Sequence, residues 1–197
     1  MIDAFWSDPH FGHAKVIEYD ERPFITVEEM NEALIENYNA VVGPNDTCLW
    51  GGDCFFYREE DMHRARMIMN RLNGRKLLVL GNHDRNPAVM FDLGFTMVAH
   101  ETFLKMGHRN VRVKHYPYFR EPKKDEVIRD RHGREMGDRQ LKRARSNAPP
   151  RVPGEVLIHG HTHSKKRRNE NMIHIGVTAW DYRPATFDEV AEEVAKV

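Results

Sequence analysis

Carboxylate, amide and imidazole side chains recur after several short apolar segments of this 197-residue chain. Each cluster follows a run with the composition of a buried β-strand. In chain order the clusters are Asp8 and His10, Asp53, Asn82 and His83, His115, and last His161 and His163. Ligands of open α/β sheets bind beyond the carboxyl ends of the strands, so we expect these five segments to meet at one site.

The residue types in these clusters are ligands of divalent metal ions. Oxygen and imidazole donors without a thiolate suit a borderline or hard cation such as manganese, iron or zinc. The set is large enough for two cations. Two cations about 3.5 to 4 Å apart need a shared carboxylate and activate a water between them. Asp53, in the middle of the set, is the predicted bridge.

The segments that connect these clusters indicate an α/β fold. Apolar residues at helical spacing predict a helix over about residues 27–42, which begins at the capping box of Thr26 and Glu29. Helices are also predicted over 59–72 and after Thr186. Predicted strands cover residues 2–6, 47–50, 77–80, 111–114, 156–158 and 172–175. Strands that alternate with helices are typical of layered α/β proteins.

Composition excludes several classes of protein. Hydrophobic residues make up 40% of the chain and charged residues 30%, which is too apolar for a disordered protein. Lysine plus arginine equals aspartate plus glutamate at 30 each, so the whole molecule has no positive field for nucleic acid. Without a bilayer-length apolar run or a signal peptide pattern, we expect a cytoplasmic protein with no membrane partner. Cys48 and Cys54 fit buried small hydrophobes better than a disulfide.

We expect a single domain over residues 1–197, with a charged insertion or lid at about 119–154. Apolar periodicity fails in that segment. A stretch of this length inside a compact domain is usually a functional loop, a lid or a disordered excursion. Its interleaved acids also suit a solvated surface or a short salt-bridged helix, and its arginines leave a nucleic-acid surface open as the alternative.

The polar clusters also form an ordered set of motifs. The chain resembles the calcineurin-like metallophosphoesterases, whose pattern is Asp-x-His, Gly-Asp, Gly-Asn-His-Asp/Glu, His and Gly-His-x-His. These motifs stand here as Asp8-Pro9-His10, Gly52-Asp53, Gly81-Asn82-His83-Asp84, His115 and Gly160-His161-Thr162-His163. One such motif is weak support, whereas the full set in order is specific.

This resemblance implies a four-layer α/β/β/α sandwich of two mixed sheets with flanking helices. It also assigns the metal ligands. One ion would be held by Asp8, His10, Asp53 and His163, and the other by Asp53, Asn82, His115 and His161. His83 would stay off the metals and protonate the leaving oxygen, and Asp84 could orient its ring. Manganese is the favoured metal, with iron, zinc and nickel as alternatives.

Three further segments resemble a branch of small bacterial and phage members of this family. They are Ser7-Asp-Pro-His-Phe-Gly-His13, Arg22-Pro23-Phe24 and Ala179-Trp-Asp-Tyr-Arg-Pro184. The protein serine/threonine phosphatases continue their Gly-Asp motif as Asp-Arg-Gly. Here that motif continues as Cys54-Phe55-Phe56-Tyr57, which argues against a phosphoprotein substrate.

Substrate contacts are predicted on both sides of the ligand motifs. His13 lies three residues after His10 and could reach a substrate phosphate. Phe55, Phe56 and Tyr57 could stack on a base, although packing of the loop is the commoner use of such aromatics. The basic run Lys165, Lys166, Arg167 and Arg168 directly follows His163 and is predicted to form a phosphate-facing rim.

Together these features predict a dinuclear metal-dependent phosphoesterase that hydrolyses by attack of a metal-bridging hydroxide. A phosphodiester is favoured over a monoester, and a nucleotide such as a cyclic nucleotide is the favoured substrate. A nuclease acting on DNA or RNA is the alternative enzyme. A non-catalytic interaction scaffold, as this fold provides in the retromer complex, is the third hypothesis, and it predicts lost ligands where none is missing.

Overall fold

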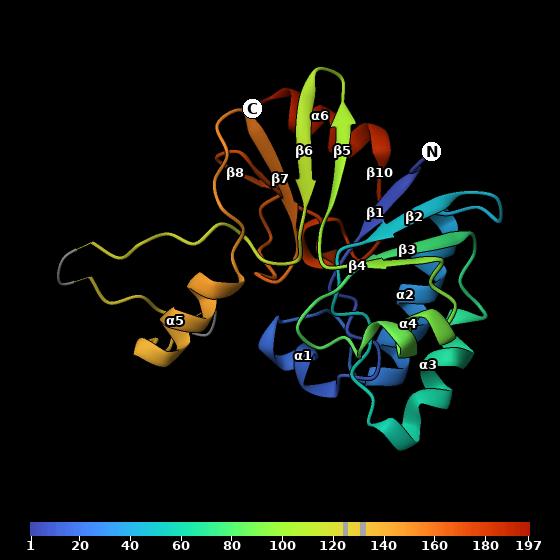
Figure 1. The fold of residues 1–197 in the computed structure, drawn as a ribbon. Coiled ribbons are helices and arrows are strands. Elements are labelled where there is room, and N and C mark those ends of the chain that lie inside the picture. The colour runs from blue at the N-terminus through green and yellow to red at the C-terminus, as the bar shows by residue number, and fades with distance from the viewer. Residues whose placement is uncertain (124–125, 131–132) are drawn as a thin grey trace.

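The computed structural model describes residues 1–123, 126–130 and 133–197. The described residues form two five-stranded sheets (Figure 1). The first sheet has the order β10 (Ala185–Thr186), β1 (Ala4–Trp6), β2 (Thr47–Trp50), β3 (Arg75–Val79) and β4 (Met97–Ala99). The second has the order β5 (Thr102–Met106), β6 (Arg109–Val113), β7 (Glu155–His159), β9 (Met172–His174) and β8 (Arg168–Asn169).

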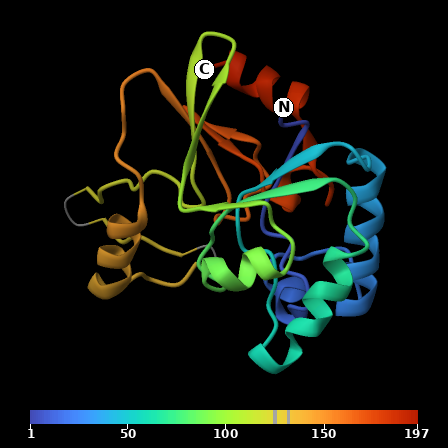
Figure 2. The same cartoon turned by 45° about the vertical axis from the view of Figure 1, so that its right-hand side comes forward.

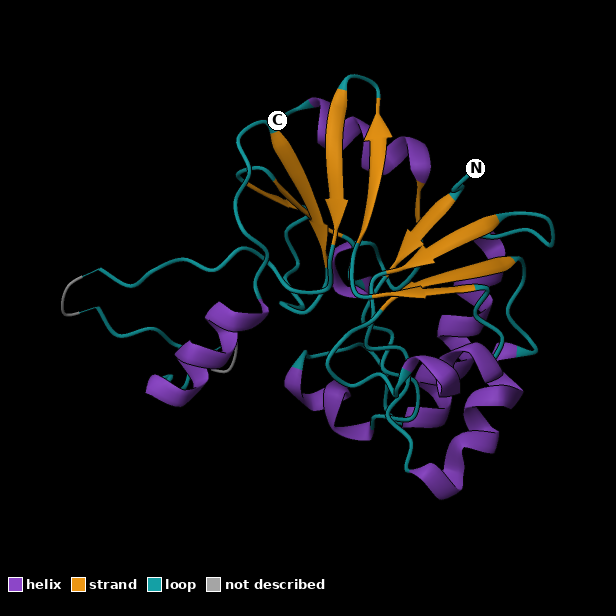
Figure 3. Cartoon of the chain, in the orientation of Figure 1, coloured by secondary structure: helices purple, strands orange, loops and turns teal. Residues whose placement is uncertain are grey.

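Both sheets are mixed. Strands β1 to β4 run parallel to one another, and β10 pairs antiparallel to β1. In the second sheet β6, β7 and β9 are parallel, and β5 and β8 are antiparallel edges. This arrangement confirms the predicted α/β sandwich of two mixed sheets with flanking helices. The parallel strands matter most here, because their carboxyl ends all point toward the middle of the molecule (Figure 3).

Four helices lie together below the first sheet in Figure 1, and their apolar residues form one core with it. They are α1 (Ala14–Tyr19), α2 (Val27–Val41), α3 (Met62–Met69) and α4 (Pro87–Asp92). Helix α2 begins where the Thr26 side chain accepts a hydrogen bond from the Glu29 amide at 3.1 Å. Its buried residues Leu34 and Tyr38 pack with Trp6 and Trp50.

A second core fills the space between the sheets. Phe5 and Leu49 come from the first sheet, Val113 and Ile158 from the second. Helix α6 (Phe187–Ala195) begins at the predicted capping box of Thr186 and adds Val190 to the same core. Side chains alternate between the two faces of a strand, so the neighbours of Val113 and Ile158 lie on the other face of the second sheet. There Tyr118, Leu157 and Met172 form a small separate cluster.

The charged insertion projects away from the sheets, as Figure 2 also shows. It contains a ten-residue helix, α5 (Asp138–Asn147), with no buried residue. A short antiparallel bridge joins Arg129 to Glu135 before this helix. Of the alternatives for the segment 119–154, a short charged helix is the one found over α5, and the role of the insertion as a lid stays a prediction. Residues 124–125 and 131–132 of the predicted insertion lie outside the described residues.

Most predicted elements appear within two or three residues of their expected bounds. The helix expected over 59–72 is a 3-10 turn at Glu59–Asp61 followed by α3, which ends at Met69. Cys48 and Cys54 are buried free thiols, as expected. In the described part of the chain, no helix has the length and apolarity needed to cross a bilayer.

Candidate metal centre

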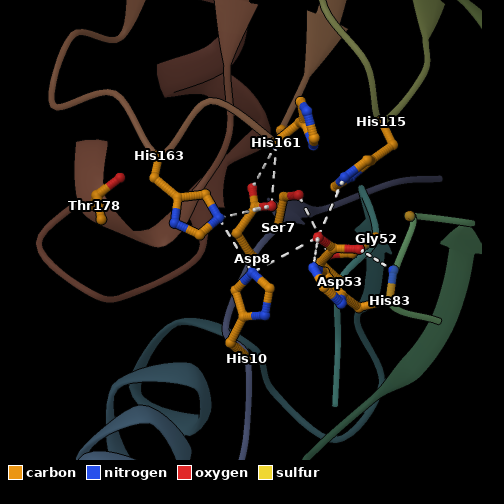
Figure 4. A network of polar contacts seen from close by, with 12 residues as sticks. Ser7, Asp8, His10, Gly52, Asp53, His83, His115, His161, His163 and Thr178 are labelled. Atoms are coloured by element: carbon orange, nitrogen blue, oxygen red, sulfur yellow. Dashed lines mark hydrogen bonds and ion pairs between the residues drawn. The ribbon is translucent and has the colours of Figure 1, made fainter. Parts of the chain in front are cut away.

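The five polar segments converge where the carboxyl ends of β1, β2 and β3 face those of β6 and β7 (Figure 4). Two groups of carboxylate and imidazole side chains lie there. Within each group the donor atoms are all within 4.8 Å of one another. The first group is Asp8, His10 and His163, and the second is Asp53, His115 and His161.

The first group joins the loop after β1 to the loop after β7. His10 Nε2 and His163 Nε2 are 3.1 Å apart, and His163 Nε2 is 3.6 Å from Asp8 Oδ1. The side chains of Asp8, His10 and His163 are all at most 3% exposed. Two imidazole nitrogens that point at the same spot in a buried setting need a cation or a proton between them.

The second group joins the loop after β2 to the loops after β6 and β7. His115 Nε2 is 3.4 Å from Asp53 Oδ2 and 3.2 Å from Asn82 Oδ1. The predicted amide ligand Asn82 therefore lies beside this group. The His161 ring packs against His115 with ring centroids 5.1 Å apart.

Asp53 lies between the two groups. Its Oδ2 atom is 3.4 Å from His115 Nε2 and 3.7 Å from His10 Nε2 in the first group. Its Oδ1 atom accepts a hydrogen bond from the His83 amide at 2.8 Å. One oxygen of the Asp53 carboxylate is thus held by the backbone, while the other faces both groups. Each of the two Asp/His groups could hold a metal ion.

The backbone of these loops is unusual at the donor residues themselves. Asp8, His10, Asp53, His161 and His163 have φ between 50° and 67°. The left-handed region costs a non-glycine residue free energy, and such strain persists only where the surroundings impose it. Close packing of the loops is one such constraint, because a Cβ at Gly81 would lie 2.2 Å from Asp53 Oδ1.

A second layer of polar residues orients the imidazole rings. His163 Nδ1 lies 2.5 Å from Asp20 Oδ2, and His115 Nδ1 lies 2.8 Å from the Gly51 carbonyl oxygen. Arg22, 4% exposed, donates to Asp20 at 3.2 Å and to the Asp8 carbonyl oxygen at 3.0 Å. Such partners fix which ring nitrogen faces the ligand site.

Mutual electrostatics keep the two carboxylates ionised. Burial acts to raise the pKa of Asp8 and of Asp53, but the neighbouring histidines outweigh it and hold both pKa values below their usual range. Burial acts to lower the pKa of His115, yet the charge of Asp53 raises it to about 9. His163 has a raised pKa, against the effect of burial, because of Asp20 and Asp8. In each group, a neighbouring carboxylate thus favours the protonated form of one imidazole.

His83 and Asp84 take different positions. The His83 side chain is 38% exposed, and its Nε2 lies 4.0 Å from Asp53 Oδ2. Asp84 is partly buried, and its carboxylate accepts hydrogen bonds from the backbone amides of Asp53, Cys54 and Gly81 at 2.8 to 2.9 Å. These bonds tie two loops together and are made to the backbone rather than to the His83 ring, in contrast to the role expected for Asp84 from the sequence.

The residues predicted to contact substrate are spread over several environments. The His13 ring stacks on Phe56, with ring centroids 3.9 Å apart, and lies beside His10. In the basic run, Lys165 pairs with Glu21 and Arg168 with Glu193. Arg167 lies over the Trp180 ring, and Lys166 lines a separate cavity. The four cations of this run thus face different partners, and their common rim stays a prediction.

A cavity of about 550 Å³ opens on the second group of donor residues. Its lining residues include Asp53, Asn82, His83 and His161. The charged insertion contributes Arg129, Asp130, Arg134 and Met136 to the same lining. The insertion therefore brings side chains of both signs to this cavity.

Sequence reasoning missed several of these residues. Asp20 and Arg22 lie in a loop without a ligand motif, and only the position of Arg22 in the Arg22-Pro23-Phe24 segment pointed to it. Arg129 and Arg134 were part of an insertion whose path could not be inferred from periodicity. Phe56 is 44% exposed and packs edge-on to His83, whereas its neighbour Phe55 is buried.

Fold and site together define an α/β sandwich protein with two adjacent buried groups able to hold metal ions. No family model matches the chain. The Gene 66 protein of Mycobacterium phage D29 is 31% identical over 214 aligned residues, which cover 96% of this chain and 94% of that protein. The chain belongs to the family of these phage Gene 66 proteins. The Gene 66 protein of Mycobacterium phage L5 is 29% identical over 96% of this chain and 92% of its own length.

Three other similarities are more limited. The uncharacterized protein MJ1445 of Methanocaldococcus jannaschii is 43% identical over 79 residues, which span 40% of this chain and 44% of that protein. A solved protein of unknown function, AQ665 from Aquifex aeolicus, covers 96% of this chain at 22% identity with a TM-score of 0.66, and 97% of its own chain is covered. This second likeness shows the fold. The E. coli phosphoesterase YfcE aligns at a TM-score of only 0.41 and 16% identity, which carries no weight for activity.

Replacement of Asp20 by Asn should weaken one metal site and leave the other. The His163 ring loses its charged partner, so affinity at the first group should fall about 10- to 100-fold. Titration of the metal-free protein with manganese or zinc measures this. The matched control Asp92→Asn removes an exposed carboxylate paired with Arg66 and should bind as the wild type does. Two unchanged affinities in Asp20→Asn would show that the contact does not position His163.

Stability of the metal-free protein should depend on pH between about 6.5 and 9.5. The pKa of His115 is about 9 in the folded chain against 6.5 unfolded. A raised pKa contributes stability that is complete below the unfolded value and is lost as pH rises through the folded one. Urea unfolding in a chelator should show a loss of about 3 kcal/mol across this range. The His115→Asn variant should show a shallower slope, and a wild-type stability that is constant or rises over the range would contradict the ion pair.

Proposed function

We propose that this protein is a metal-dependent phosphoesterase that works with two divalent cations. The single observation that carries the proposal is the position of Asp53. Its Oδ2 atom lies 3.4 Å from His115 and 3.7 Å from His10, so one buried carboxylate serves both donor groups. In this proposal Asp8, His10, Asp53 and His163 hold one cation. Asp53, Asn82, His115 and His161 hold the other.

The donor chemistry supports the choice of metal. Three carboxylate or amide side chains and four imidazoles, with no thiolate, favour manganese, with iron, zinc and nickel as alternatives. The buried setting supports a cation as well, because within each group carboxylate and imidazole donor atoms lie within 4.8 Å of one another. When bound, two such cations polarise the phosphoryl oxygens and lower the pKa of a water that attacks phosphorus.

His83 is the proposed proton donor to the leaving oxygen. Its side chain is 38% exposed and lines the 550 Å³ cavity beside Asp53 and Asn82. Its backbone is anchored, since its amide donates to Asp53 Oδ1. Because its backbone is fixed beside the metal ligands and its ring lines the cavity, His83 can donate a proton without binding a metal ion itself.

We propose a phosphodiester of a nucleotide as the substrate. A cavity of about 550 Å³ is in the range of small-molecule sites and has room for one nucleotide. Arg129 and Arg134 line this cavity and can supply donors for phosphoryl oxygens, although Arg134 also pairs with Asp130. Phe56, stacked on His13 and 44% exposed, offers a face for a base.

The alternative enzyme is a nuclease on DNA or RNA. The side chain of Lys165 is 71% exposed, and Lys166 is exposed as well. Both lie shortly after the predicted ligand His163, so a polymer backbone could extend over them. The two substrates respond differently to salt, because a polymer held by several cations weakens steeply as salt rises. The scaffold hypothesis is disfavoured, since all seven predicted ligand residues are present.

Asp53→Ala should abolish hydrolysis of diester substrates and leave less than two bound cations per chain. The variant withdraws a ligand from both cations at once. Elemental analysis of protein reconstituted with manganese measures the metal content. Asn82→Ala is the graded comparison, and it should loosen one cation only. Near-normal diesterase activity with two bound cations in Asp53→Ala would overturn the bridging assignment.

His83→Ala should retain both cations while turnover falls about 10²- to 10⁴-fold for substrates with poor leaving groups. An acidic phenol departs with little help from a proton donor, so aryl esters should lose less. Rates on a series of diesters with leaving groups of increasing pKa measure the effect. A loss that is the same across the series would mean that His83 positions substrate instead of donating the proton.

A further inference from the structure

A second cavity of about 380 Å³ lies on the other side of the ligand loop from the metal centre. We call it the outer cavity. His159 on β7 and His174 on β9 lie opposite each other in the parallel register and form part of its wall. Their neighbours Ile158 and Ile173 point into the core between the sheets. The two histidines therefore lie on the opposite, outer face of the second sheet.

The wall of the outer cavity contains buried polar atoms whose hydrogen bonding is incomplete in the described part of the chain. Among the described residues, Thr162 Oγ1 has no partner, and the Tyr118 hydroxyl and the His174 ring nitrogens make no hydrogen bond of normal geometry, although Glu155 and the Ser164 backbone lie near them. The His174 residue is only 2% exposed. Buried polar groups are nearly always paired with protein, water or ligand, and an unpaired one costs about 1–3 kcal/mol. Several such atoms around one cavity point to a polar occupant.

The charges around the outer cavity favour an anion. Arg120, Arg151 and Lys166 line it, and Glu170 is the one carboxylate among the lining residues described. Arg151 contacts Glu170 at 3.1 Å and lies over the Tyr118 ring. Arg120 contacts Glu126 with two nitrogens. Each guanidinium has five donors, so both arginines retain donors beyond these contacts.

Thr162 connects the outer cavity to the metal centre, because it lines both cavities. The threonine lies between His161 and His163, the two ligand residues of the loop after β7. An anion in the outer cavity would thus lie one loop away from the metals. Of the other residues in this loop, His161 lines the cavity at the metal centre and Ser164 lines the outer cavity.

We propose that the outer cavity is a second binding site for a phosphate group, separate from the metal centre. Arg120, Arg151 and Lys166 hold the charge, and Thr162 and His174 donate from the buried wall. The phosphate group is either free, as inorganic phosphate or a monoester product, or it is a phosphate of a polymeric substrate next to the scissile one. The binding itself stands on this cavity alone, and only its role in turnover rests on the proposed function.

Equilibrium dialysis of the manganese-loaded protein against radiolabelled inorganic phosphate tests the proposal. Wild type should bind two phosphates per chain, one at each site, and Asp53→Ala should retain one. The double variant Arg120→Gln/Arg151→Gln should lose affinity at the retained site by about tenfold or more. The matched control Arg139→Gln/Arg145→Gln removes two arginines of α5, neither of which lines the outer cavity, and should bind as the wild type does.

Two results would overturn the proposal. One is a single phosphate per chain in wild type that disappears in Asp53→Ala. The other is a retained phosphate in Asp53→Ala whose affinity is the same with and without Arg120 and Arg151. Because both arginines are at the surface, thermal unfolding of the double variant should match that of the control pair.

Kinetics then distinguish the two sources of the phosphate group. With Arg120→Gln/Arg151→Gln, a rise in KM for an oligonucleotide but not for bis(p-nitrophenyl) phosphate assigns the site to a neighbouring phosphate of the substrate. Unchanged KM values for both substrates assign it to free phosphate. Absence of any hydrolysis would refute the proposed function and leave the dialysis result intact.

Discussion

Asp8 and Asp53 are carboxylates with almost no exposure to solvent, and their need for positive charge constrains the rest of the site. Burying a carboxylate charge without a partner costs so much free energy that the carboxylate would bind a proton instead. Here His115 and His163 lie against the two carboxylates, and Arg22 donates a hydrogen bond to the main-chain carbonyl oxygen of Asp8. The protein thus surrounds its two anions with imidazoles, groups that can exchange a proton for a metal ion at neutral pH.

This constraint explains the local backbone. Donor residues in left-handed conformations bring their side chains into a space that regular strand ends would not reach. Glycines at 52, 81 and 160 allow the loops to approach closely, with a Cβ at Gly160 falling 2.1 Å from Ser7 Oγ. Asp84 fastens the loop after β3 to that after β2 through the backbone amides of Asp53 and Cys54. Strain at the donors is balanced by these fixed contacts, which come from loops and not from the sheets.

The sequence was informative where side-chain chemistry coincides with strand ends. Asp53 and His115 follow predicted strands directly, so their convergence needed only the rule that parallel strands open at one edge. Asp20 escaped notice because its contact to His163 spans 143 residues and leaves no local pattern. Burial of Phe55 beside exposed Phe56 was equally hidden, since both are the same residue type in one loop. The insertion was the least predictable part, because α5 has no buried face to impose a period.

Each donor group takes residues from both sheets. Asp8 and His10 come from the first half of the chain and His163 from the second, and Asp53 is matched with His115 and His161 in the same way. A cation bound in either group would therefore link loops that follow strands of both sheets. Its binding free energy would stabilise the folded arrangement of the two sheets. Metal supply would then set how cooperatively the chain unfolds and how often the connection between β4 and β5 opens to a protease. For such a protein, the cellular concentration of metal would govern its lifetime as well as its turnover.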